Sequence, residues 1–380
     1  FHQNEASYSS QTTKDVIEFL IKAKESTVHY RATLKSIIDV NEEVMLKATT
    51  QQENVLLATK YMDRLIIQGV AGSGKTLLAS KLAVDFAKEG KAVLFVCFNR
   101  LLGSILEKQI EKSEFLDVYI YHDLIDFYYR QANKVYDFKQ KSDEDVFYDL
   151  LEHETKKYDV LIIDEAQDFS DTKISILLQQ LKEAGKCFLF MDENQKVIEY
   201  TSIQTEGFQR IFLETNLRNA KPIFDKVKEN YVLSYPISSA GPKEGHFEIT
   251  EPYEPEHQVK LYSIIRNTVN KLVNEEKIKH SDISIITMTS LSKTMLSDFD
   301  FKTVTTSKFK DEYNGDLLRI DTVRRFKGVE SNVLIVTELE GILKYPKEIQ
   351  QKLLYTAFSR AKHSLIIIPS TTVLTQFDLK

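Results

Sequence analysis

The residues of this chain that could carry phosphate chemistry begin with a glycine-rich string, Gly69-Val-Ala-Gly-Ser-Gly74-Lys75-Thr76. It has the form G-x-x-x-x-G-K-[ST], in which glycines let backbone N–H groups turn inward on a phosphate chain. Such a loop predicts that Lys75 reaches the β- and γ-phosphates of a nucleotide and that the Thr76 hydroxyl binds Mg²⁺. The other loop residues expected to hold the nucleotide are Gly69, Gly72, Ser73 and Gly74.

A pair of carboxylates is the second chemical motif, and it follows the apolar run Val160-Leu-Ile-Ile. At the carboxyl end of a strand beside a phosphate loop, Asp164 is expected to hold Mg²⁺ and Glu165 to orient the attacking water. Apolar runs that end in acidic residues are common, so the pair alone is a weak signal. Its position after a phosphate loop makes it a strong one and predicts Mg²⁺ bound together with the phosphates of a nucleotide.

Hydrophobic patterning predicts the elements that must position these groups. From Arg64 onward, short β-branched runs alternate with longer amphipathic stretches, beginning with RLIIQG, KTLLASKLAVDFAKEGK and AVLFVCF. This alternation predicts an α/β fold with mostly parallel sheets and helices on both faces. It also gives the glycine string a strand before it and a helix after it, which disfavours an ordinary glycine turn. Further strands are expected at VYIYH, VLIID, CFLFMD, ISIITM, VLIVTEL and SLIIIP.

The length of the chain, 380 residues, is large for one core and fits two domains. The segment 234–258 holds four of the seven prolines, which indicates a linker or a loop-rich entry to a second domain. We therefore predict a helical segment at 1–45 and a first domain at 46–215 with a small helical insertion at about 131–157. The second domain is predicted at 216–380.

The composition is that of an ordinary soluble protein, with 42% hydrophobic and 28% charged residues. No run approaches the ~18 continuous apolar residues of a membrane span, so we expect no membrane partner. Cys97 and Cys187 lie in apolar runs as small buried side chains do, and a cytoplasmic location is expected. The formal net charge of −6 disfavours a sequence-specific DNA binder but allows a strand held in one locally basic groove.

The carboxylate pair extends to the string DEAQD, Asp164–Asp168, and a phosphate loop followed by DEAQD resembles the UvrD/Rep-like group of superfamily 1 helicases. Six motifs in order, from about Thr49 to Pro369, make coincidence implausible. The resemblance implies two RecA-like domains with ATP in the cleft between them. The four later strings that resemble motifs of this group are Met191–Gln195, Thr215–Arg218, Thr322–Glu330 and Tyr355–Ala361.

This resemblance assigns nucleotide-binding roles residue by residue. Gln52 matches the glutamine that reads adenine, although Gln51 stands beside it and the two are not separated. Gln195 would sense the γ-phosphate, while Gly328 and Glu330 match positions at the nucleotide, Glu330 being the acid near the ribose.

Two arginines, Arg218 and Arg360, match those that reach the γ-phosphate from the second domain of this group. There they would stabilise the charge that the phosphoryl oxygens develop in the transition state. The alternative for each is a structural ion pair. Leu217 departs from the pattern, because the family has at this position a tyrosine that stacks on adenine. A weaker grip on adenine is therefore expected.

The resemblance also implies contacts with a single strand. Tyr200 is where the family places an aromatic ring for base stacking, which is worth ~1–3 kcal/mol per base irrespective of sequence. Tyr200 could instead be an ordinary half-buried tyrosine, and His122 a capping or core histidine. The residues matched to strand contacts are Phe98, Asn99, Arg100, His122, Tyr200, Thr322 and Arg324.

The expected function is an ATP-dependent translocase or helicase on single-stranded nucleic acid, with DNA as the expected strand. The string Cys97–Leu102 resembles bacterial helicase-like proteins with an upstream nuclease-related domain, and a chain that begins at Phe1 without Met is expected to have an upstream segment. The alternative is a nucleic-acid-stimulated ATPase switch that regulates an attached or partner nuclease. A non-enzymatic binding module is disfavoured, because the acidic and basic residues of the ATP site are all present.

Overall fold

The computed structural model describes residues 34–35, 50–100, 102–103, 113–137, 140–151, 155–196, 207–301, 304–310 and 316–376. They belong to one compact unit that begins at Leu34. The helical segment expected at 1–45 lies outside the described residues except for Leu34 and Lys35, and Tyr200 lies outside them too.

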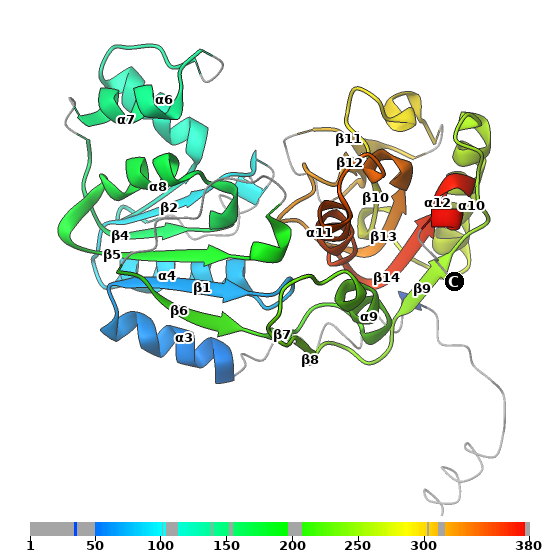
Figure 1. Ribbon diagram of the computed structural model, residues 1–380, viewed down its shortest axis with the longest axis horizontal. Coiled ribbons are helices and arrows are strands. Elements are labelled where there is room, and N and C mark those ends of the chain that lie inside the picture. The colour runs from blue at the N-terminus through cyan, green and yellow to red at the C-terminus, as the bar shows by residue number, and fades with distance from the viewer. Residues whose placement is uncertain are drawn as a thin grey trace, which may run out of the picture. The chain divides into compact units, whose positions relative to one another are not determined.

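A six-stranded parallel sheet forms first along the chain, in the order β3-β2-β4-β5-β1-β6 (Figure 1). Its central strands are continuous apolar runs because both faces of a parallel sheet are covered by helices. The sequence prediction found five of these strands and missed β6. The strands are β1 (Arg64–Gly69), β2 (Val93–Cys97), β3 (Leu116–Ile120), β4 (Tyr158–Ile163), β5 (Leu181–Met191) and β6 (Gln209–Leu213).

Helices cover both faces of this first sheet. On one face, α3 (Thr50–Tyr61) and α4 (Lys75–Lys88) share a hydrophobic core with the strands. The other face carries α6 (Tyr121–Gln131), α7 (Asp143–Leu151) and α8 (Asp171–Leu178), as Figure 1 shows. The helical insertion expected at 131–157 contains α7. The predicted strand VYIYH ends early, because Tyr121 and His122 begin α6.

A second six-stranded parallel sheet follows, in the order β11-β12-β10-β13-β14-β9. One face is covered by α9 (Lys221–Glu229) and α11 (Lys347–Phe358), and the other by α10 (Gln258–Asn274). The helix α12 (Thr371–Gln376) ends the described chain. The strands are β9 (His246–Ile249), β10 (Ile283–Thr287), β11 (Thr306–Lys308), β12 (Leu318–Thr322), β13 (Ser331–Thr337) and β14 (Ala361–Ile368).

The two sheets repeat one arrangement. Without the edge strands β6 and β11, the orders β3-β2-β4-β5-β1 and β12-β10-β13-β14-β9 place equivalent strands side by side. In both sheets the middle strand of these five is followed by an acidic residue in the left-handed region, Glu165 at φ 52° and Glu338 at φ 54°. A short 3₁₀ helix follows each one. The α/β class and the pair of RecA-like sheets expected from the sequence are confirmed.

The chain crosses from one sheet to the other through 214–245, where β7 (Thr215–Asn216) pairs with β8 (Ser238–Ser239). The proline-rich segment 234–258 is not simply a linker, because it contains β9, an edge strand paired with β14. This strand has four half-buried residues and no long apolar run, so its sequence gives little strand signal. No helix in the described part of the chain is long and apolar enough to span a membrane.

Candidate functional site

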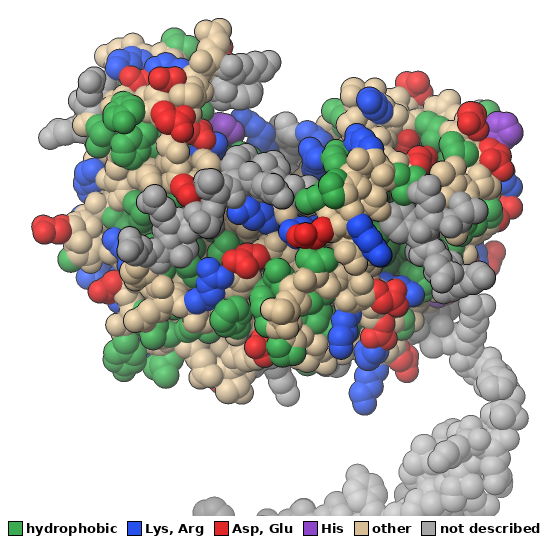
Figure 2. Space-filling model, viewed as in Figure 1, with side chains coloured by type: hydrophobic (Ala, Val, Ile, Leu, Met, Phe, Trp, Pro, Cys, Tyr) green, Lys and Arg blue, Asp and Glu red, His purple; other side chains and the backbone are tan. Residues whose placement is uncertain are grey.

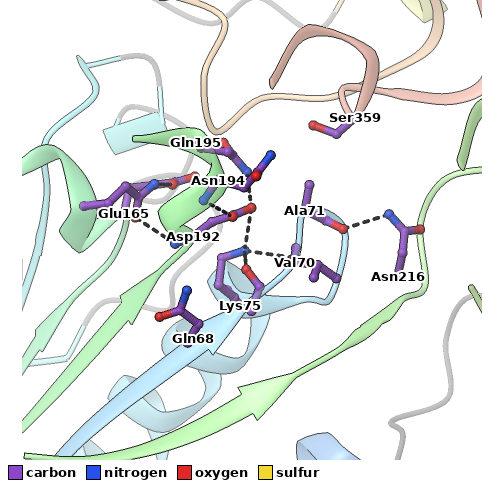
Figure 3. A network of polar contacts seen from close by, with 12 residues as sticks. Gln68, Val70, Ala71, Lys75, Glu165, Asp192, Asn194, Gln195, Asn216 and Ser359 are labelled. Carbon is purple, nitrogen blue, oxygen red and sulfur yellow. Dashed lines mark hydrogen bonds and ion pairs between the residues drawn. The ribbon is translucent and has the colours of Figure 1, made fainter. Parts of the chain in front are cut away.

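The glycine string forms the turn between β1 and α4. Gly72 and Gly74 have φ of 73° and 83°, a region that residues with a Cβ rarely adopt. A Cβ on Gly74 would also lie 2.4 Å from Nε2 of Gln52. Lys75 starts α4, and its Nζ donates to the carbonyls of Gly69 at 2.9 Å and Val70 at 3.0 Å. The ammonium group therefore lies over the mouth of the loop (Figure 3).

Three carboxylates surround this ammonium group. Asp192 is nearest, with Oδ2 3.8 Å from Lys75 Nζ. Burial lowers the pKa of Lys75, whereas the charges of Asp192, Glu165 and Asp164 raise it. Burial outweighs these charges, so the pKa of Lys75 is lowered overall.

Thr76 and Asp164 meet where the sequence predicts magnesium. The Thr76 hydroxyl donates to Asp164 Oδ2 at 2.7 Å, and burial together with the neighbouring Glu165 raises the pKa of Asp164 to about 7. Hydroxyl and carboxylate oxygens are the ligands Mg²⁺ prefers, usually completed by phosphates and water. The described part of the chain has no group of three or more His, Cys, Asp or Glu residues that could hold a metal ion.

Glu165 occupies a strained backbone position at the carboxyl end of β4. Its φ of 52° is rare for a residue with a side chain and is held here by the surrounding contacts. Gln167 Nε2 donates to Glu165 Oε2, and Gln167 Oε1 accepts from the backbone N–H of Asp192 at 3.0 Å. Burial raises the pKa of Glu165, but the charges of Lys327, Arg360 and Lys75 outweigh it and lower the pKa. The carboxylate is therefore ionised near pH 7.

The turn Asp192–Gln195 after β5 receives side chains from the second sheet. Gln195 Nε2 donates to Asp192 Oδ2 at 2.8 Å, and Arg360 Nη2 donates to Gln195 Oε1. Lys327 Nζ donates to the Gln195 carbonyl at 3.3 Å and to Asp168 Oδ1 at 2.5 Å. Arg360, which follows α11, is thus placed beside the residue predicted to sense the γ-phosphate.

Arg218, the second predicted arginine, belongs to a different network. Its Nε lies 2.6 Å from Glu330 Oε2, and Lys362 Nζ lies 2.8 Å from Glu330 Oε1. Burial raises the pKa of Glu330, but Arg218 and Lys362 lower it to about 2. Glu330 is therefore a carboxylate shared by two cations.

One cleft of about 730 Å³ joins these groups. Gln52 and Leu217 are not among its lining residues: Gln52 Nε2 donates to the Ser73 carbonyl at 2.9 Å, and the Leu217 N–H donates to the Gly72 carbonyl at 2.9 Å. Asp164 lies behind Thr76. The predicted site residues that do line the cleft are Gly72, Gly74, Lys75, Thr76, Glu165, Gln195, Arg218, Gly328, Glu330 and Arg360.

Aromatic side chains pack together at the carboxyl ends of β2 and β3. The ring centroid of Phe98 lies 6.3 Å from that of Tyr121, 5.5 Å from that of His122 and 5.4 Å from that of Phe169. Nδ1 of His122 is 3.2 Å from the Tyr136 hydroxyl. Burial, with the charges of Lys173 and Arg100, lowers the pKa of His122, so the ring is neutral near pH 7. Phe98 and His122 are packed together, with half-buried side chains.

Asn99 connects this region to the second sheet, because its Nδ2 donates to the Arg325 carbonyl at 3.2 Å. Thr322 is buried at the end of β12. Two predicted strand contacts have exposed charged groups: Arg100 pairs with Asp123 at 3.2 Å, and Arg324 bonds the Tyr345 hydroxyl at 3.3 Å. Figure 2 shows acidic and basic side chains mixed over the face in view, without a broad surface of one sign.

Several residues that line the cleft or bond its lining received no role from the sequence. Each lies inside or beside a recognised motif string, which is the only signal that could have found them. Their contacts join parts of the chain far apart in sequence, which residue spacing does not reveal. They are Gln167, Asp192, Lys327, Tyr355 and Lys362.

Two repeated parallel sheets, a phosphate loop on the first and a charged cleft shared with the second define a superfamily 1 helicase-type domain. Residues 63–302 match the family described as "Schlafen group 3, DNA/RNA helicase domain". Residues 317–368 match the "UvrD-like helicase C-terminal domain". Since the first match alone covers more than half of the chain, the chain belongs to the Schlafen group 3 DNA/RNA helicase domain family. Neither match includes a nuclease-related domain.

Two solved structures are similar to the chain at low sequence identity. The "Crystal structure of Arterivirus nonstructural protein 10 (helicase)" is 14% identical with a TM-score of 0.42, covering 80% of this chain and 59% of that one. The "Complex structure of Arterivirus nonstructural protein 10 (helicase) with DNA" is 14% identical with a TM-score of 0.43, covering 83% and 62%. The chain thus spans about three fifths of the length of these helicases. No curated protein matches it.

Proposed function

We propose that this domain hydrolyses ATP and uses the cycle to move along single-stranded nucleic acid, with DNA as the preferred strand. The observation that carries the proposal is the cleft itself. It gathers Lys75, Thr76 and Glu165 from the first sheet with Arg218 and Arg360 from the side of the second. Cations supplied from both sides of a cleft suit a phosphoryl transfer, in which negative charge spreads over the phosphoryl oxygens.

Each residue has a role in the proposed reaction. The backbone of the phosphate loop and Lys75 bind the β- and γ-phosphates, exchanging the Gly69 and Val70 carbonyls for phosphate oxygens. Thr76 and Asp164 would hold a magnesium ion, which when bound neutralises charge on the phosphate oxygens.

The remaining groups act on the terminal phosphate. Glu165 orients the attacking water, and its ionised state supports that role. Gln195 and Arg360 contact each other before nucleotide enters, so both are expected to reach the γ-phosphate together. Arg218 joins them when it leaves Glu330, and Glu330 is then free to accept from a ribose hydroxyl.

The strand is proposed to lie over the carboxyl ends of β2, β3 and β12. There Asn99 joins the two sheets by bonding the Arg325 carbonyl, so cleft closure would change the spacing of the two halves of this surface. Arg100 and Arg324 supply exposed cations for the phosphates of the strand. If the two halves of this surface bound the strand tightly in turn, the strand would move along the domain.

A second candidate is an ATPase switch that controls an attached or partner nuclease in the cytoplasm without processive unwinding. It is favoured by the direct bonds that already cross the cleft, Arg360 to Gln195 and Asn99 to Arg325. Direct bonds across the cleft suit a small rearrangement better than a large movement of its two sides.

The deciding experiment measures ATP turnover with and without single-stranded DNA and RNA, together with displacement of a fluorescent strand. We expect turnover that rises with DNA. Turnover and stimulation without displacement or movement would favour the switch. No turnover with either nucleic acid would refute both candidates.

A further inference from the structure

A buried tyrosine of the second sheet's helix α11 reaches the phosphate loop. The Tyr355 hydroxyl accepts from the backbone N–H of Ala71 at 2.7 Å and donates to Asp192 Oδ2 at 3.1 Å. Ala71 belongs to the glycine string, and Asp192 directly follows β5. One hydroxyl therefore touches both the loop and the turn that would surround the terminal phosphates.

The acceptor of this hydroxyl is shared with the groups of the phosphate site. Asp192 Oδ2 also accepts from Gln195 Nε2 at 2.8 Å and lies 3.8 Å from Lys75 Nζ. Burial, with the charge of Asp192, raises the pKa of Tyr355 well above its usual value. The hydroxyl keeps its proton at any working pH, and its removal would leave Asp192 with a weaker hold from the second sheet.

Ala71 is held through both of the peptide groups that flank its Cα. Its N–H bonds Tyr355, and its carbonyl accepts from Asn216 Nδ2 at 2.7 Å (Figure 3). Asn216 Oδ1 in turn accepts from the backbone N–H of Arg218 at 3.1 Å. The same loop residue thus connects to the segment that carries one of the two arginines.

The other arginine is connected through α11. The N–H of Ser359 donates to the Tyr355 carbonyl at 3.1 Å, and the N–H of Arg360 donates to the Ala357 carbonyl at 3.1 Å. Because these bonds continue the end of the helix, Tyr355 and Arg360 move together. Ala71 is therefore connected by hydrogen bonds to both arginine-bearing segments.

We propose that Tyr355 is a positioning residue whose hydroxyl sets the register between the phosphate loop and the α11 segment that delivers Arg360. A phosphate that binds in the loop accepts hydrogen bonds from its backbone N–H groups and changes the bond between the Ala71 N–H and the Tyr355 hydroxyl. The end of α11 then shifts and positions Arg360 at the phosphate. This rests on the proposed ATPase function. A buried hydroxyl could instead serve only the stability of the fold, and the chain offers a matched control for that case.

Tyr253 is the control. It is buried, and its hydroxyl donates to a carboxylate, Glu340 Oε1, at 2.8 Å. Both partners belong to the second sheet's side of the chain, and neither lines the cleft. Tyr355→Phe and Tyr253→Phe each remove one oxygen atom from a buried ring and one hydrogen bond to a carboxylate.

The test compares the two variants with the unchanged chain in melting temperature, ATP turnover, affinity for a non-hydrolysable ATP analogue and amide hydrogen exchange of the phosphate loop. We expect both variants to melt within a few degrees of each other. Tyr355→Phe alone should lower kcat at least tenfold, change analogue affinity less than threefold and accelerate loop exchange. Stimulation by single-stranded DNA should fall with kcat.

Turnover of Tyr355→Phe within twofold of Tyr253→Phe would overturn the proposal. Amide hydrogen exchange of the phosphate loop that is the same in Tyr355→Phe and in the unchanged chain would overturn the proposal as well. In that case the hydrogen bond between Ala71 and Tyr355 would not stabilise the loop. The exchange measurement needs no hydrolysis. If the unchanged chain shows no turnover, the proposed ATPase function fails, while the exchange result still decides whether Tyr355 positions the loop.

Discussion

Replacing Arg360 with alanine distinguishes an arginine that acts on the γ-phosphate from one that supports the fold. In the structure Arg360 is buried, donates from Nη2 to Gln195 Oε1 and lines the cleft. Its Nε has no hydrogen-bond partner among the described residues. This side chain therefore has bonding capacity left for a ligand.

The two roles predict effects of different size. The variant loses one hydrogen bond from a charged group, worth about 1.5–3 kcal/mol, but it also relieves the desolvation of a partly satisfied buried charge. The net change in melting temperature is therefore expected to be a few degrees at most. Loss of the charge from the transition state is expected to lower turnover by about 10³-fold, which is about 4 kcal/mol.

The assay measures turnover per folded molecule, melting temperature and nucleotide affinity on one preparation. Arg319→Ala is the structural control, because Arg319 is a buried arginine of the second sheet that pairs with Asp321 at 3.3 Å and does not line the cleft. We expect that variant to lose stability and keep its turnover per folded molecule. If Arg360→Ala behaves in the same way, Arg360 is structural, and the placement of ATP in this cleft is refuted.

Two further substitutions and one competing nucleotide test the part of the cleft that the first sheet forms. Lys75→Ala should abolish detectable turnover while circular dichroism shows an intact fold, and wild-type turnover would contradict the phosphate-loop assignment. Glu165→Gln should still bind ATP, because Asp164 remains, and should tighten single-strand binding in a filter assay; unchanged hydrolysis would remove Glu165 from the reaction. GTP should compete with ATP within about a hundredfold, or ~2.7 kcal/mol, because Leu217 cannot stack on adenine. A stricter ATP preference would mean that another contact, such as Gln52, is sufficient for adenine.

Central strands could be predicted from the sequence because burial on both faces leaves an unmistakable pattern. Five strands of the first sheet and the strands β10, β13 and β14 of the second coincide with apolar runs. The edge strands β6, β9 and β11 were missed; β6 has several exposed residues and β9 only half-buried ones. The inner strand β12 is the exception among central strands, because its buried run Leu318–Thr322 contains the charged pair Arg319 and Asp321. An edge strand needs no second apolar face, and its sequence therefore resembles that of a loop.

The cleft residues could be predicted where the contacting groups are close together in the sequence. They could not be predicted where the contacting groups are far apart in the sequence. Glycines, Lys75 and Thr76 lie in one string, and their backbone geometry follows from residue type. The pairs Arg360–Gln195 and Tyr355–Asp192 are 165 and 163 residues apart. The motif resemblance brought Arg360 to the nucleotide, but no spacing rule could show that Tyr355 bonds Ala71.

A nucleotide could close this cleft if the cationic side chains that line it exchanged their protein partners for phosphate oxygens. Every cation that would meet its phosphates already has a partner: Lys75 the loop carbonyls and Asp192, Arg218 the Glu330 carboxylate, and Arg360 the Gln195 amide. A triphosphate would displace the partners of Lys75 and Arg218, so its binding energy would be spent in part on rearranging them, whereas Arg360 can also bind through its Nε. Two of the three, Arg218 and Arg360, belong to the side of the second sheet. Their transfer from protein partners to phosphate would therefore pull that side toward the phosphate loop, and loss of the γ-phosphate would return them.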